Sequence, residues 1–277
     1  MKFNSIKTKL SLGMVSALFG ASAFAKENFG ELERVGKPDL NGHWLQPAIG
    51  EQAEITHQLH DITIWLSLGV IVFVTVLLAI VVVKFRDTGK EPKRFTHNTP
   101  LEIVWTLVPV LILVFLAVYS VPALLKQTRV PEGEVVIKVT GNQWNWEYEY
   151  PEEGFSFLSL KLEKDQLEEF GYMPDEYLLA VDNAIVVPVD TDVVVEVTAS
   201  DVIHSWKIPA FTIQTDAVPG RLHTTWFNAT KEGVYFGQCS ELCGKDHAYM
   251  PIVVKVVSKE QYAKWLEDAK IGDIFNS

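Results

Sequence analysis

The chain has 277 residues, of which 48% are hydrophobic, and its formal net charge at pH 7 is −11. The charge is uneven, since residues 130–277 hold 25 acidic against 11 basic residues, whereas residues 1–129 hold 10 against 13. An acidic surface of this kind repels nucleic acid and attracts basic proteins, although many acidic domains are simply soluble. We therefore expect no nucleic acid partner.

The first 25 residues have the pattern of a signal peptide. Lysines at positions 2, 7 and 9 precede an apolar segment that ends in the small-x-small sequence Ala23-Phe24-Ala25. A short membrane anchor is the alternative, but the apolar segment is short and rich in small residues. Cleavage after Ala25 would place the new amino terminus outside the cytoplasm, followed by a polar periplasmic arm over residues 26–60.

Residues 61–125 predict a hairpin of two transmembrane helices. The apolar runs Ile62–Val83 and Leu101–Leu125 are each long enough to cross a bilayer, and membrane helices tolerate an internal proline such as Pro109. The loop 84–100 between them is rich in lysine and arginine, which favours the cytoplasmic side. Both ends of the hairpin are therefore expected on the periplasmic side.

Residues 126–258 predict an all-β sandwich, because short β-branched or alternating runs are separated there by Gly, Pro, Asn and Asp. The acidic segment 161–176 is most simply a surface excursion or a short helix. We expect strands at residues 135–139, 144–150, 184–187, 193–197, 224–227, 234–236 and 252–257.

Residues 259–277 predict a C-terminal helix and tail. The helical spacing of Tyr262, Trp265 and Leu266 gives this segment one apolar face. We expect that face to pack against the outside of the sandwich.

The densest chemistry lies in residues 238–250, which contain both cysteines of the chain. Soft sulfur and nitrogen ligands occur there together, a set that suits copper better than calcium, magnesium or manganese. His204, which follows the strand-like run 193–197, can add a second imidazole, and two thiolates in one loop could bridge two copper ions. The metal-capable side chains of the loop are Cys239, Cys243, His247 and Met250.

Two other interpretations of this loop remain open. Two cysteines in an oxidising compartment often form a disulfide. A tetrahedral zinc site also uses Cys and His, but rarely Met. Methionine as a long axial ligand beside Cys and His is typical of copper electron-transfer sites, which favours copper.

Four segments together resemble subunit II of cytochrome c oxidase, a family whose members carry the dinuclear copper centre CuA. Their order and spacing also agree, and the resemblance extends from about residue 55 to residue 257. It implies a membrane hairpin carrying a cupredoxin-like sandwich, in the bacterial inner membrane with the sandwich on the periplasmic side. The segments are Gln143–Tyr150, Asp201–Trp206, Thr215–Arg221 and Gly237–Gly244.

The resemblance also implies a ligand set. The family's copper ligands fall on His204, Cys239, Cys243, His247, Met250 and the backbone carbonyl of Glu241, and none of these positions is substituted. The side chain of Glu241 matches a ligand of magnesium or manganese at the border with subunit I. A carboxylate suits such a hard cation.

Routes for electrons and protons follow from the same resemblance. Trp144 matches the tryptophan that takes up electrons from cytochrome c, and Glu147, Glu149 and Asp201 match acidic docking positions. Glu102 matches the mouth of a proton pathway into subunit I, although a solvated residue at the start of a helix is the simpler interpretation. In the family, electrons pass to the haems of subunit I, where oxygen is reduced to water and protons are translocated.

The partners implied by the resemblance are subunit I, other oxidase subunits, cytochrome c and the lipid bilayer.

Two alternative functions remain. The subunit II of a quinol oxidase shares the architecture, but the resemblance implies that it lacks the copper ligands. A membrane-anchored copper chaperone would use similar ligands without needing the aromatic run at residues 143–150, the hairpin and Glu102 together.

Overall fold

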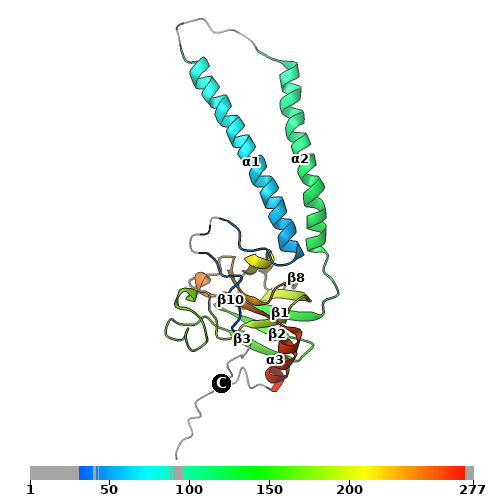
Figure 1. Ribbon diagram of the computed structural model, residues 1–277, viewed down its shortest axis with the longest axis vertical. Helices are drawn as coiled ribbons and strands as arrows, with labels where there is room; N and C mark the ends of the chain where they lie inside the picture. The colour runs from blue at the N-terminus through cyan, green and yellow to red at the C-terminus, as the bar shows by residue number, and fades with distance from the viewer. Residues whose placement is uncertain (1–30, 40–41, 43, 88, 90–95, 272–277) are drawn as a thin grey trace, which may run out of the picture.

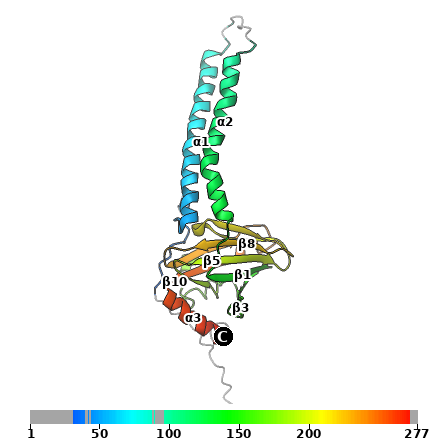
Figure 2. The ribbon, with the colours of Figure 1, turned by 90° about the vertical axis from the view of Figure 1, so that its right-hand side faces the viewer.

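The computed structural model describes residues 31–39, 42, 44–87, 89 and 96–271. The expected signal peptide lies outside these residues, as does most of the centre of the expected cytoplasmic loop. Two long helices project from the same end of a β-domain, and a short helix lies on the side of that domain (Figures 1 and 2).

The two expected apolar helices are present as α1 (Glu51–Lys84) and α2 (Thr99–Thr128), and both are long and apolar enough to cross a membrane. Their apolar side chains are largely exposed, which is what a lipid-facing surface requires. Residues 51–60, which we expected in the polar arm, are helical. The hydrocarbon core needs only about 20 helical residues, so α1 extends beyond it.

Ten strands form the β-domain, in two five-stranded sheets with the orders β3-β2-β1-β5-β8 and β4-β10-β9-β6-β7. Most neighbouring strands are antiparallel, but β1 pairs with β5 and β4 with β10 in parallel. The strands are β1 (Val135–Asn142), β2 (Asn145–Tyr150), β3 (Phe155–Ser159), β4 (Ile185–Pro188), β5 (Asp192–Ala199), β6 (His204–Ile208), β7 (Ile213–Ala217), β8 (His223–Asn228), β9 (Gly233–Cys239) and β10 (Pro251–Val257). Single 3-10 turns occur at η1 (Pro174–Glu176), η2 (Pro209–Phe211) and η3 (His247–Tyr249).

The expected sandwich is confirmed, and all seven predicted strands correspond to observed ones, but β3, β6 and β7 were not predicted. These three strands have five residues each. In β7, which reads Ile-Gln-Thr-Asp-Ala, only the first and last residues are buried. This segment forms a strand because it pairs with β6. Such tertiary pairing cannot be recognised from the periodicity of the sequence.

The core between the sheets is rich in aromatic side chains. On β2, Trp146, Tyr148 and Tyr150 point inward and alternate with polar residues. The Tyr150 hydroxyl donates a hydrogen bond to the Val186 carbonyl on the facing sheet at 2.8 Å, and Trp206 Nε1 lies 3.4 Å from the Tyr148 hydroxyl. The buried polar groups of these rings are therefore paired across the sandwich.

The acidic segment 161–176 is more than a surface excursion. Leu162, Leu167 and Tyr172 are buried in a second cluster, which also contains Phe236 and Val253 of β9 and β10. β9 and β10 are thus covered on both faces. This explains why both strands are apolar nearly throughout instead of alternating.

The described part of the N-terminal arm lies across this covered region. The Gly36 N–H donates to the Val234 carbonyl at 3.0 Å, and Arg34 Nε donates to the carboxylate of the fully buried Glu176 at 3.1 Å. The C-terminal helix α3 (Lys259–Ile271) is present as expected, and Trp265 packs its ring against Tyr150. Both ends of the described chain therefore brace the β-domain.

Candidate metal centre

The six expected copper ligands converge at one end of the sandwich. The two cysteine sulfurs are 3.9 Å apart. His204 Nδ1 lies 3.9 Å from the Cys239 sulfur, and the Glu241 carbonyl oxygen lies 3.4 Å from the same sulfur. On the other side, the Cys243 sulfur lies 3.6 Å from His247 Nδ1 and 3.5 Å from the Met250 sulfur.

Neighbouring strands hold this arrangement. His204 is the first residue of β6 and Cys239 the last of β9, and the two strands are paired. The loop between Cys239 and Pro251 connects β9 to β10, which are paired antiparallel with Pro251 opposite Gln238. Both ends of the ligand loop are therefore fixed by sheet hydrogen bonds, and η3 presents His247 within it.

The His204 ring is fully buried and closely surrounded. Its Nε2 lies 2.9 Å from Asp201 Oδ1, so Nδ1 is the nitrogen that faces the cysteines. The Trp146 ring meets the imidazole edge to face at 5.9 Å between centroids. On the remaining side, a Cβ added to Gly141 would lie 2.9 Å from the imidazole ring, so this strand position has room only for glycine.

The two cysteine thiols of the cluster differ in proton affinity. Burial alone would raise the pKa of the Cys239 thiol, but hydrogen bonding with His204 brings it down to about 7. Burial and the neighbouring Cys239 raise the pKa of the Cys243 thiol to about 12. Two adjacent thiolates repel each other unless a positive charge lies between them, which is the role of a thiolate-bound metal.

The donor set discriminates between the interpretations left open by the sequence. Both cysteines are free, and their sulfur separation of 3.9 Å is far longer than the roughly 2.05 Å of a disulfide bond. Two sulfurs, two imidazole nitrogens, a thioether and a carbonyl oxygen exceed the four ligands of a structural zinc site. The residues present fit a soft copper site better than a structural zinc site.

The turn between β1 and β2 covers the cluster. Gln143 Nε2 donates a hydrogen bond to the Cys243 carbonyl at 2.8 Å, and the half-buried Trp144 indole rests on Gly244. A Cβ at Gly244 would lie 3.1 Å from Trp144 Cζ2, and its φ of 126° also favours glycine. The indole therefore contacts the ligand loop one residue beyond Cys243.

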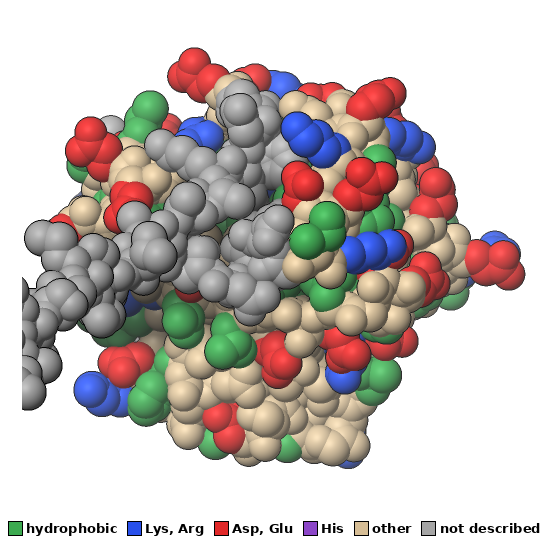
Figure 3. Space-filling view, turned by 90° about the horizontal axis from the view of Figure 1, so that it is seen from below, with side chains coloured by type: hydrophobic (Ala, Val, Ile, Leu, Met, Phe, Trp, Pro, Cys, Tyr) green, Lys and Arg blue, Asp and Glu red, His purple; other side chains and the backbone are tan. Residues whose placement is uncertain are grey.

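The remaining predicted residues lie outside the cluster. The Glu241 side chain is exposed. Asp201 is also exposed, although its carboxylate makes hydrogen bonds with Gln143 and His204. Glu147 and Glu149 are half-buried on the outer face of β2, where Lys138 Nζ lies 2.7 Å from Glu149 Oε2. Acidic side chains also spread over the end of the β-domain that faces away from the helices (Figure 3).

Glu102 lies at the other end of the hairpin. Its Oε1 accepts a hydrogen bond from the Asn98 N–H at 3.1 Å, while Asn98 Oδ1 accepts one from the Leu101 N–H at 3.2 Å. This reciprocal cap starts α2. The arrangement accounts for Glu102 as a helix-start residue, and its role in proton transfer stays a prediction.

Sequence reasoning missed the contacts of Gly141, Gln143 and Gly244, and the bond between Asp201 and His204. Gly141 lies near the end of β1, two residues beyond the predicted strand 135–139, and an isolated glycine in a strand signals a close approach. That signal could have marked Gly141 only if the strand had been predicted to its full length. Nothing comparable in the sequence marks the Gln143 side chain.

The chain is similar to known proteins over nearly its whole length. Residues 135–257 match the family model described as the periplasmic domain of cytochrome c oxidase subunit II, and residues 38–123 match the model of its transmembrane domain. The chain is 46% identical to cytochrome c oxidase subunit 2 of Cereibacter sphaeroides over 98% of its own length and 94% of the relative's. It is 41% identical to the subunit 2 of Zea mays over 76% and 83% of the two chains.

One similar solved structure is the periplasmic domain of subunit II of cytochrome oxidase from Bradyrhizobium japonicum. It is 48% identical and covers 52% of this chain and 99% of its own, with a TM-score of 0.47.

Proposed function

This chain belongs to the cytochrome c oxidase subunit II family, and we propose that its β-domain takes up electrons from cytochrome c and passes them to the haems of subunit I. As a member of this family, the chain is a subunit of a haem-copper oxidase. The observation that carries the proposal is the convergence of six donor groups around two free cysteines. A dinuclear copper centre bound there would accept and release one electron at a time.

In this proposal each ligand has a defined place. Cys239, Cys243, His204 and His247 would hold the copper through sulfur and imidazole nitrogen, and Met250 and the Glu241 carbonyl would add weaker ligands. His204, Cys239, Cys243 and Met250 are buried, and the loop is fixed by β-sheet pairing at both ends. A rigid, dry scaffold limits the rearrangement that accompanies each electron transfer.

Electrons reach this centre through Trp144, which contacts the ligand loop at Gly244. Glu147, Glu149 and Asp201 form part of the acidic surface that attracts a basic cytochrome c. The exposed Glu241 side chain binds magnesium or manganese at the border with subunit I, and Glu102 lies at the mouth of a proton pathway on the opposite membrane face.

The two apolar helices support a location in a membrane. α1 and α2 anchor the chain in the bacterial inner membrane, and the basic loop between them stays in the cytoplasm. The β-domain then lies in the periplasm, where a cytochrome c can reach it. The arrangement also brings the β-domain close to the membrane surface, since α2 ends only a few residues before β1.

Copper analysis of Cys239→Ser and Cys243→Ser tests the proposal. A hydroxyl cannot replace a bridging thiolate, so we expect each variant of the purified oxidase to lose the dinuclear centre and its mixed-valence absorption while the β-domain stays folded. Leu242→Ala, in the same loop and 77% exposed in the parental chain, is the matched control and should keep both copper ions. Two copper ions and an unchanged spectrum in either serine variant would refute bridging by the thiolates.

A further inference from the structure

Trp44 and Leu45 of the N-terminal arm are two large apolar side chains that serve no step of the proposed electron transfer. Trp44 is 63% exposed and Leu45 is 43% exposed. Backbone hydrogen bonds of Gly36 and Ile49, each 3.0 Å long, attach the arm to the β-domain on either side of this pair. The arm thus presents two apolar side chains outward between two points of attachment.

Trp44 lies against the lower part of α1. Its ring meets the His60 ring edge to face, with 5.3 Å between the ring centroids and an interplanar angle of 81°. In Figure 1 the arm, drawn in dark blue, lies beside the end of α1 nearest the β-domain. The depth of His60 in the membrane therefore also gives the depth of Trp44.

The length of the apolar run on α1 places His60 among the lipid headgroups. About 20 helical residues cross the hydrocarbon core. Counted from Val83, beside the basic loop, this length ends near Ile64, and His60 lies four residues farther out. Four residues span about 6 Å along a helix, and a headgroup layer is about 5–8 Å thick. By this count, Trp44 lies in the headgroup layer of the outer leaflet.

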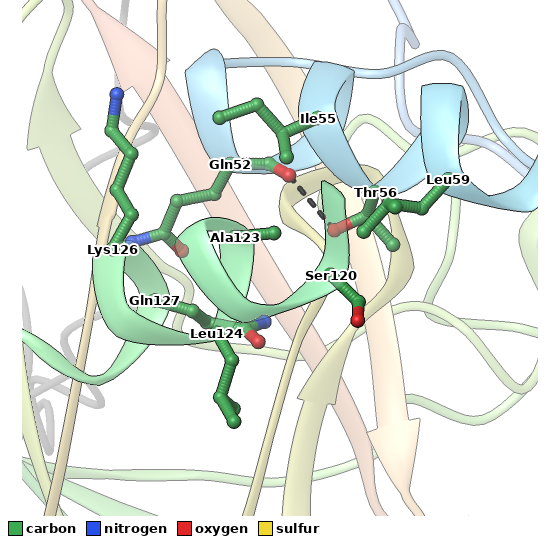
Figure 4. A pocket seen from close by; sticks show the side chains of 9 residues that line it. All are labelled: Gln52, Ile55, Thr56, Leu59, Ser120, Ala123, Leu124, Lys126 and Gln127. Carbon is green, nitrogen blue, oxygen red and sulfur yellow. Dashed lines mark hydrogen bonds between the residues drawn. The ribbon is translucent and has the colours of Figure 1, made fainter. Parts of the chain in front are cut away.

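The second helix gives a similar depth. Counted from Leu101, the same length of about 20 residues ends near Ser120. Ser120 and Leu59 line a cavity of about 190 Å³ between the two antiparallel helices, and they are its lining residues farthest from the β-domain (Figure 4). By this count, His60 lies at the edge of the hydrocarbon core. Both counts place Trp44 between that edge and the outer limit of the headgroups.

Aromatic side chains already mark this level on both helices. Trp65 of α1 is 72% exposed, and Tyr119 of α2 is 48% exposed. Trp and Tyr are enriched where a membrane protein passes from hydrocarbon to headgroups, because their rings are apolar and their N–H or O–H groups are polar. Trp44 is a side chain of the same type at the same depth, but it belongs to the arm.

We propose that Trp44 and Leu45 insert into the headgroup layer of the outer leaflet, which makes the arm a third membrane contact beside α1 and α2. The proposal rests on the membrane location inferred above. The Trp44 N–H donates to lipid oxygens, while the indole ring and Leu45 lie against the upper part of the acyl chains. Because the arm is bonded to the β-domain, this contact limits tilting of the β-domain about the hairpin.

Photo-cross-linking of the purified oxidase in nanodiscs made with its native lipids tests the proposal. The photoreactive amino acid p-benzoylphenylalanine replaces Trp44, Ile71 or Lys264, one at a time, and mass spectrometry identifies what each position is joined to. Ile71, 61% exposed in the middle of α1, is the positive control. The exposed Lys264 is the water-facing control, since α3 lies on the side of the β-domain away from the helices (Figure 2). We expect lipid adducts at positions 44 and 71 and their loss at position 264.

Three results would overturn the proposal. A cross-link from position 44 to another oxidase subunit would make the arm a contact between subunits. The same products at position 44 as at position 264, with lipid adducts at position 71, would place Trp44 in water. Absence of lipid adducts at position 71 as well would refute the membrane location itself, and this contact with it.

Discussion

Asp201 Oδ1 lies 2.9 Å from His204 Nε2, and the other carboxylate oxygen of Asp201 accepts a hydrogen bond from the Gln143 N–H at 2.7 Å. One carboxylate thus orients an expected copper ligand and also fixes the turn that carries Trp144. Burial would raise the pKa of Asp201, but the hydrogen bonds from His204 and the backbone lower it below its usual value. Asp201 is therefore expected to position the metal site as well as to attract cytochrome c.

Replacing Asp201 should affect the copper centre, whereas replacing a residue that acts only through its charge in docking should not. Asp201→Asn loses one acceptor, so either the imidazole or the Gln143 N–H loses its partner, and the reduction potential of the copper centre should shift. Glu149→Gln, the control, should leave the potential unchanged and slow association with cytochrome c by about twofold to fivefold, in keeping with an exposed charge. Spectroelectrochemical titration together with stopped-flow mixing measures both. Unchanged potential in Asp201→Asn would leave only the docking role.

This bond shows where sequence reasoning stops. The clustering of the expected ligands was predictable, because five of the six lie in one loop and the sixth begins a nearby strand. The orientation of His204 was not, since it depends on a turn at Asp201 and on Gly141 in a strand far away in sequence. Prediction of the strands failed at the three five-residue strands β3, β6 and β7, and β7 is a strand only through its partner β6.

The proposed magnesium or manganese site would depend on the exposed Glu241 side chain. Glu241→Gln keeps the backbone carbonyl that lies 3.4 Å from Cys239 but replaces an anionic ligand of a hard cation with a neutral one. We expect manganese occupancy of the purified oxidase to fall at least about tenfold while copper content stays the same. Electron paramagnetic resonance after growth on manganese measures this occupancy. Glu232→Gln, another exposed acid of the β-domain, is the control, and full occupancy in Glu241→Gln would contradict the role.

The N-terminal arm should contribute to stability through its ion pairs with the buried Glu176. Arg34→Met leaves Lys37, whose Nζ lies 3.9 Å from Glu176 Oε1, as the remaining cation, and we expect a loss of about 2–3 kcal/mol in the free energy of unfolding, reduced from the fully buried case because Arg34 is partly exposed. Lys231→Met breaks the exposed pair with Glu33 in the same region and should cost less than about 1 kcal/mol. Urea unfolding followed by tryptophan fluorescence compares the two. Equal losses would mean that the arm is held by its backbone hydrogen bonds instead.

The route of electron uptake can be divided into docking and transfer, because docking depends on surface charge and transfer on the group that spans the gap to the metal. The Trp144 indole rests on Gly244, next to Cys243, so its removal opens a gap in the contact path between the surface and the ligand loop. Trp144→Ala should keep the affinity for cytochrome c within about tenfold, or roughly 1.4 kcal/mol, and slow transfer inside the complex by a larger factor. Glu149→Gln should show the reverse, with weaker salt-dependent association and unchanged transfer. Flash-initiated transfer at saturating cytochrome c, measured across a range of ionic strength, distinguishes the two effects. A parental rate in Trp144→Ala would make Trp144 a packing residue and would require another route for the electrons.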